Sequence, residues 1–106
     1  MMRRARSVDE YVAMVKDAIY ETEDMRAALE YDEESMSYTR DFIDELEGSL
    51  KQMLEDMKTG NYCWRTGDLP YMKVIADVDD LLLPFRPLLL RINDTHCNGL
   101  EPEDEA

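Results

Sequence analysis

The sequence is poor in the residues that strands and tight turns require. Its 106 residues include only four Gly and four Pro, and aromatic residues make up 8%. Strands favour β-branched and aromatic residues, and sandwiches or barrels need frequent tight turns, so this composition argues against an all-β fold. A hydrophobic fraction of 44% with eight Met suits helices that pack around one core. A chain of this length fits one domain that folds without metal or disulfide staples.

Cysteine and long apolar runs are also scarce. Two cysteines, Cys63 and Cys97, cannot form a disulfide framework, and the basic start of the chain (residues 1–6) is not followed by the apolar run of a secretion signal. We therefore expect a cytoplasmic protein. The most apolar stretch, residues 81–92, is too short to span a bilayer, so no membrane anchor is expected.

What the chain has in excess is acid, and most of it lies in one region. The 25 Asp and Glu outnumber the 12 Lys and Arg, which gives a net charge of −13. Residues 17–47 hold twelve of these acids against two Arg, a local net charge of −10. Phosphate backbones and anionic lipids repel such a protein. We therefore expect a basic protein partner, no direct nucleic-acid binding and no membrane binding.

Apolar residues recur at helical spacing through this acidic region, so its charge is expected on the outside of helices. Ser7 and Glu10 have the spacing of a capping box and predict a first helix over residues 7–31. Its apolar stripe is Val8, Tyr11, Val12, Val15, Ala18, Ile19, Thr22, Met25 and Leu29.

A second helix is predicted over residues 32–59. Asp32 is its expected N-cap, with Glu33–Glu34 in the first turn, and Gly60 follows its end. Its apolar stripe is Thr39, Phe42, Ile43, Leu46, Leu50, Met53, Leu54 and Met57.

These two helices are expected to pair as an antiparallel hairpin. The alternative is one continuous helix, because no Gly or Pro lies between Ser7 and Glu47. Such a helix would be about 75 Å long and would leave its apolar stripe without a partner in the same chain.

The C-terminal half predicts a loop and two shorter helices. The loop covers residues 60–70, Asp68 is the expected cap of a third helix over 71–83, and a fourth helix over 85–98 stops at Gly99. The third stripe is Tyr71, Val74, Ile75, Val78, Leu81 and Leu82, and the fourth is Phe85, Leu88, Leu89, Ile92 and His96.

These segments predict an all-α, up-and-down bundle of three to four helices, built on the acidic N-terminal hairpin. The bundle would form one domain over residues 1–106, with a basic disordered tail at 1–6 and a frayed acidic tail at 101–106.

The acidic face of the hairpin is the first candidate binding site. Its carboxylates fall opposite the apolar stripes and would attract a basic partner and speed its association. They are Asp17, Glu21, Asp24, Asp41 and Asp44. The alternative is that they only solvate the helices, although a balanced surface would do so without this much self-repulsion.

Two hydrophobic segments offer further candidate contacts. Tyr62 and Trp64 lie in the predicted loop, where they could form an exposed contact or seal the open end of the bundle, and we favour the seal. Leu83 and Leu90 fall off the main stripes and could form a groove for a partner or for a second copy of the chain.

Catalytic and metal sites find little support. Acidic pairs such as Asp77 and Asp80 are of the kind that all-α nucleotide pyrophosphohydrolases use to hold Mg²⁺, but any acidic helix contains such pairs. Cys63, His96 and Cys97 lack the spacing of a zinc motif. His96 is instead expected to be half-buried near a helix C-terminus, where its protonated form is favoured. We expect no catalytic residue, no cofactor and no metal, and we find no family motif.

Taken together, the sequence predicts a small binding or adaptor protein that is not an enzyme and that docks a basic protein through its acidic hairpin. One alternative is a nucleic-acid mimic, in which rows of carboxylates imitate phosphates and occupy the basic groove of a DNA-handling protein. The other is a metal-dependent nucleoside triphosphate pyrophosphohydrolase.

Overall fold

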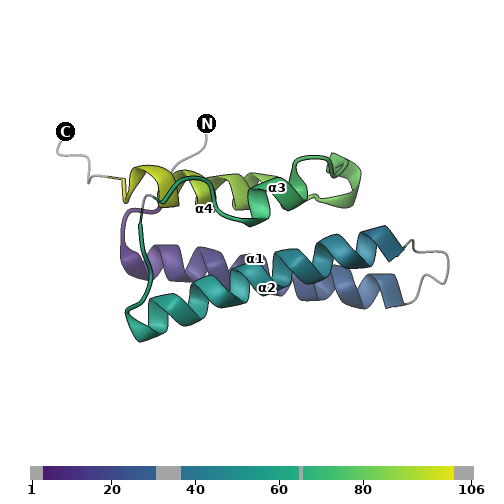
Figure 1. The fold of residues 1–106 in the computed structure, drawn as a ribbon, viewed down its shortest axis with the longest axis horizontal. Coiled ribbons are helices and arrows are strands. Elements are labelled where there is room, and N and C mark those ends of the chain that lie inside the picture. The colour runs from purple at the N-terminus through teal and green to yellow at the C-terminus, as the bar shows by residue number, and fades with distance from the viewer. Residues whose placement is uncertain (1–3, 31–36, 65, 102–106) are drawn as a thin grey trace.

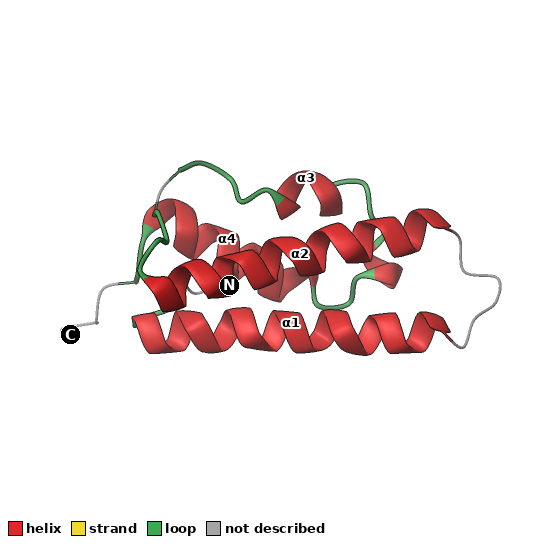
Figure 2. Ribbon diagram, turned by 60° about the horizontal axis from the view of Figure 1, so that its bottom comes forward, coloured by secondary structure: helices red, strands yellow, loops and turns green. Residues whose placement is uncertain are grey.

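The computed structural model describes residues 4–30, 37–64 and 66–101, and the regular structure in these ranges is entirely helical (Figures 1 and 2). The helices are α1 (Val8–Glu30), α2 (Ser37–Thr59), α3 (Tyr71–Ile75), the short 3₁₀ helix η1 (Asp80–Leu82) and α4 (Arg86–Asn98). The predicted all-α bundle is therefore confirmed.

The helices form two layers. Figure 1 shows α1 and α2 side by side and antiparallel, which rules out one continuous helix across both. α3 and α4 form the second layer, in which α4 packs on α1 and α3 packs on α2. Two hydrogen bonds fix α4 antiparallel to α1: Thr95 accepts from the Ala5 N–H at 3.0 Å, and the Tyr11 hydroxyl donates to the Ile92 carbonyl at 3.3 Å.

The ends of the hairpin helices follow their capping residues. Ser7 Oγ accepts from the Glu10 N–H at 3.1 Å, as a capping box requires, but the Glu10 carboxylate reaches back to the Arg6 N–H instead of that of Ser7. After α2, Gly60 has a φ of 79°, and the Asn61 N–H donates to the Asp56 carbonyl at 2.8 Å. This is the 6→1 bond of a Schellman ending, which a glycine at positive φ allows. Residues 32–34, the expected start of this helix, lie outside the described residues.

One hydrophobic core lies between the two layers. It contains most of the predicted stripe residues, among them Tyr11, Val15, Ala18, Ile19, Phe42, Ile43, Leu46, Leu50, Met53, Tyr71, Ile75, Leu89 and Ile92. Two stripe assignments are wrong, because Val8 is 55% exposed at the first turn of α1 and Leu81 is 89% exposed on η1. Met14, which the stripes omitted, is buried.

The predicted third helix over residues 71–83 is wrong, because α3 ends at Ile75. In a longer helix, the carbonyls of Ile75 and Val78 would accept hydrogen bonds from backbone N–H groups. Here the Arg86 side chain donates to both, to the Ile75 carbonyl at 3.0 Å and also to the Val78 carbonyl. Its Nε donates to Asp80 at 2.6 Å. A guanidinium with several donors in a fixed plane suits this task, since it satisfies two carbonyls at once.

Asp68 does not cap α3, contrary to expectation. Pro70 occupies the cap position without a side-chain hydrogen bond, and the Asp68 carboxylate instead accepts from the Asn93 amide at 3.1 Å. The Asn93 side-chain oxygen accepts in turn from the Leu69 N–H at 2.8 Å. Buried Asn93 thus ties the loop before α3 to the middle of α4.

The segment before α1 is packed, which corrects the prediction of a disordered tail at residues 1–6 for its described part. Ala5 is fully buried, and its carbonyl accepts from the Glu101 N–H at 2.7 Å. Glu101 is correspondingly held, although it was assigned to the frayed tail at 101–106. Residues 1–3 and 102–106 lie outside the described residues.

The core predicts a sharp contrast between two leucines. We expect Leu46→Ala to lower the free energy of unfolding by about 2 to 5 kcal/mol, because Leu46 is fully buried in the core cluster and its loss leaves a cavity. Leu81→Ala, the same chemical change on an exposed side chain, should change it by no more than about 0.5 kcal/mol. Urea denaturation monitored by circular dichroism measures both, and equal effects would contradict the assigned core.

Candidate functional site

All five carboxylates of the predicted acidic face are exposed. Asp17, Glu21 and Asp24 are spaced by four and three residues on α1, so they lie along one side of that helix. Asp41 and Asp44 are spaced by three residues on α2 and likewise share a side. The sequence therefore placed these side chains correctly in solvent.

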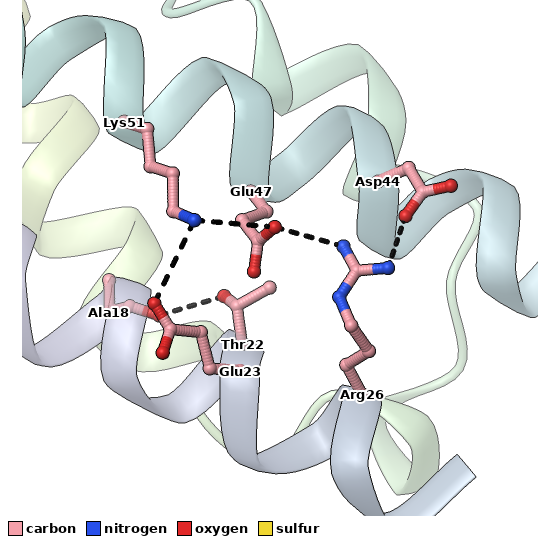
Figure 3. Close-up of polar contacts among 7 residues, drawn as sticks. All are labelled: Ala18, Thr22, Glu23, Arg26, Asp44, Glu47 and Lys51. Carbon is pink, nitrogen blue, oxygen red and sulfur yellow. Dashed lines mark hydrogen bonds and ion pairs between the residues drawn. The ribbon is translucent and has the colours of Figure 1, made fainter. Parts of the chain in front are cut away.

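The seam between α1 and α2 is closed by a group of ion pairs, shown in Figure 3. Arg26 of α1 reaches across to Asp44 and also to Glu47, the latter at 3.1 Å. Lys51 of α2 lies 3.6 Å from Glu47 and 3.9 Å from Glu23. Glu47 thus sits between two cations.

Asp44 differs from the other four carboxylates of the acidic face, because it forms an ion pair at this seam. The hydrogen bond that the Arg26 guanidinium donates to Asp44, together with the nearby charge of Glu47, raises the pKa of this guanidinium. Among the side chains that the structure describes, no cation forms an ion pair with Asp17, Glu21, Asp24 or Asp41. Asp44 contributes to hairpin pairing, whereas Asp17, Glu21 and Asp24 are exposed to solvent.

Tyr20 lies among the α1 carboxylates and was not selected from the sequence. Its side chain is 70% exposed, with Asp17 one turn before it and Asp24 one turn after it. An exposed large aromatic side chain is informative when charged residues surround it, because aromatic residues are enriched where interfaces concentrate their binding energy. The sequence feature that could have identified Tyr20 is its position outside the apolar stripe of α1, which predicts an exposed aromatic side chain.

Tyr62 and Trp64 belong to an aromatic cluster that covers one end of the bundle. The Trp64 ring stacks on Tyr11 with centroids 5.1 Å apart, and the Tyr62 ring meets Tyr11 edge-on at 5.9 Å. The Tyr62 and Tyr11 hydroxyls are 2.7 Å apart, and burial raises the pKa of Tyr62 to about 12. Trp64 remains 37% exposed at the outer side of the cluster. These contacts favour the seal over a free hot spot.

His96 is more deeply placed than expected. It is only 2% exposed, its Nδ1 meets the Tyr62 hydroxyl, and its Nε2 lies 2.9 Å from the Thr66 hydroxyl. Burial lowers the pKa of the imidazole. The expectation that the helix C-terminus favours protonated His96 is therefore wrong, because desolvation outweighs the helix dipole here.

Cys63 and Cys97 are both free thiols. Cys63 is exposed, and Cys97 lies 3.6 Å from an Asp68 oxygen, which contributes with burial to raising the pKa of the Cys97 thiol. Within the described ranges, no group of three or more His, Cys, Asp or Glu side chains is arranged to hold a metal ion. Asp80, one of the acidic pair at 77 and 80, is engaged by Arg86.

The two leucine candidates have different positions. Leu83 is 1% exposed and belongs to the core cluster, so little of its side chain is accessible to a partner. Leu90 is half-buried and lines a hollow of about 540 Å³, to which Leu83 and the two prolines Pro84 and Pro87 also contribute. In the described ranges, no helix combines the length and apolarity needed to cross a bilayer.

Comparison of the chain with protein-family models, with curated proteins and with solved structures found no match.

The burial of His96 predicts how stability depends on pH. The unfolded chain takes up a proton near the ordinary histidine pKa of about 6.5, whereas folded His96 resists protonation to lower pH. Its contribution to stability is thus complete above about pH 6.5 and is lost as the pH falls toward the folded pKa. We expect the free energy of unfolding, measured with urea between about pH 8 and pH 5.5, to decline at the acid end.

A His96→Gln variant provides the control, since His96 is the one histidine in the sequence. The variant should be less stable overall but should show a flatter pH profile in this window. If the parent and the variant decline in parallel, a group other than His96 governs the pH dependence.

Proposed function

We propose that the chain is a binding or adaptor protein that docks a basic protein partner through the acidic face formed by Asp17, Glu21, Asp24, Asp41 and Asp44. The observation that carries this proposal is the row of three exposed α1 carboxylates with no ion-pair partner among the described side chains. In this proposal the protein acts in the cytoplasm by binding and catalyses no reaction.

The distribution of charged side chains over the hairpin supports this proposal. Two cations of the hairpin, Arg26 and Lys51, are engaged in ion pairs at the seam and pair with none of the three α1 carboxylates of the acidic face. Same-sign charge without an ion-pair partner on the exposed side of α1 destabilises the folded chain by self-repulsion. A basic surface would relieve that repulsion on binding, and long-range attraction would raise the association rate.

Tyr20 supplies a second kind of contact on the same side of α1. A tyrosine ring flanked by carboxylates suits the side chain of an arginine or lysine, because the cation can lie over the ring while its charge meets an acid. The face therefore combines steering charge with one exposed aromatic ring. A uniformly charged, purely solvating surface needs no such ring.

The proposal predicts opposite effects of charge removal on binding and on stability. A triple variant with Asp17→Asn, Glu21→Gln and Asp24→Asn should be as stable as the parent or slightly more stable, since repulsion is removed. A partner captured by the parent should associate with this variant more slowly. In the parent the association rate should fall steeply with salt, because the screening length shrinks from about 8 Å at physiological ionic strength.

A matched control removes three exposed carboxylates elsewhere: Asp9→Asn, Glu55→Gln and Asp77→Asn. It has the same net charge as the triple variant and should keep the partner. If both variants lose the partner equally, net charge and not this face accounts for binding. If both variants keep the partner, the acidic face only solvates the helices. Displacement of the partner by duplex DNA would favour the nucleic-acid mimic.

A further inference from the structure

A second site is suggested by a cavity beside the loop that follows α2. Its volume is about 340 Å³, within the range of roughly 300 to 1,000 Å³ that small-molecule sites occupy. It is lined by the C-terminal half of α2, by loop residues within 61–63 and 66–70, and by His96 of α4. Met53, Leu69 and Pro70 give it an apolar wall. Its size limits a ligand to about one ring or a short chain.

The polar wall of this cavity is held in place by hydrogen bonds. His96 joins Tyr62 through Nδ1 and Thr66 through Nε2, so one buried ring positions two hydroxyl groups of the loop. Tyr62 is held again by the Tyr11 hydroxyl. A ligand would meet a wall that is already ordered, which lowers the entropic cost of binding.

Among the lining residues that the structure describes, formal charge has one sign. Asp56 carries a negative charge, and these described residues include no Lys or Arg. Gln52 donates to one oxygen of Asp56 at 2.9 Å, which orients the carboxylate on the rim. The last turn of α2 also lies here, and the carbonyl end of a helix adds partial negative charge. Burial keeps His96 neutral near physiological pH, so it adds no opposing charge.

We propose that this cavity binds a small organic amine, whose ammonium group meets Asp56 while its apolar body lies against Met53, Leu69 and Pro70. The charge of the site disfavours phosphates and carboxylates. The apolar wall disfavours metal ions and fully polar cations. This site is separate from the acidic face, and neither proposal depends on the other.

Three probes of one shape test the charge preference: benzylamine, benzyl alcohol and benzoate. Each is titrated into the ¹⁵N-labelled chain at neutral pH and physiological salt while amide chemical shifts are recorded. Benzylamine should produce saturable shifts in residues 49–56 and 61–70, with weaker binding by benzyl alcohol and none by benzoate. Benzoate binding as tight as that of benzylamine, or saturable shifts confined to other regions, would overturn the proposal, as would the absence of saturation.

Two single variants distinguish the site from the general attraction of a cation to an acidic protein. Asp56→Asn should weaken benzylamine binding by about tenfold, because it removes a charge-assisted hydrogen bond. Glu55→Gln removes the same charge from the neighbouring exposed residue, which does not line the cavity, and should leave binding unchanged. Equal weakening in both variants would mean that net charge, and not this cavity, attracts the probe. The preference of the parent protein among the three probes decides the matter even if a variant folds poorly.

Discussion

The pairing of α1 with α2 is the contact on which the rest of the structure depends. Each helix alone would expose its apolar stripe to water, and helices in proteins gain most of their stability from packing that stripe against a partner. Side by side, the two stripes form one side of the core, on which α3 and α4 can settle. Arg26 and Lys51 form ion pairs across the outer edge of the seam, so these two cations support pairing within the acidic region. Packing and charge thus act on the same boundary.

Much of this fold could be predicted because its signals are local. Capping residues and three- to four-residue periodicity located α1, α2 and α4 to within a few residues, apart from the start of α2. The third helix failed for a reason that no local pattern contains: Arg86 lies eleven residues beyond Ile75 and only the folded chain brings its side chain to that carbonyl. Leu81 was misplaced with it, since its assumed helical register ended at the same break.

In the candidate site, too, the features that depend on local spacing could be predicted and those that depend on tertiary contacts could not. Exposure of the five carboxylates follows from their position opposite the apolar stripes, which is a local property. That Asp44 is shared with Arg26 depends on the contact between two helices, and this could not be read from spacing alone. The depth of His96 is likewise a tertiary property, because the residues that cover it, Tyr62 and Thr66, lie some thirty positions away. Spacing predicts which way a side chain faces, but its partners require the packed structure.

Ala5 joins regions at opposite ends of the described chain. Its N–H is held by the Thr95 side chain and its carbonyl by the Glu101 N–H, so one residue bridges the entry to α1 and the exit from α4. These hydrogen bonds hold the first and last described segments of the chain together. If either terminal segment unfolds locally, the other loses its hydrogen-bond partners. We therefore expect the two segments to exchange their amide hydrogens as one cooperative unit instead of fraying separately.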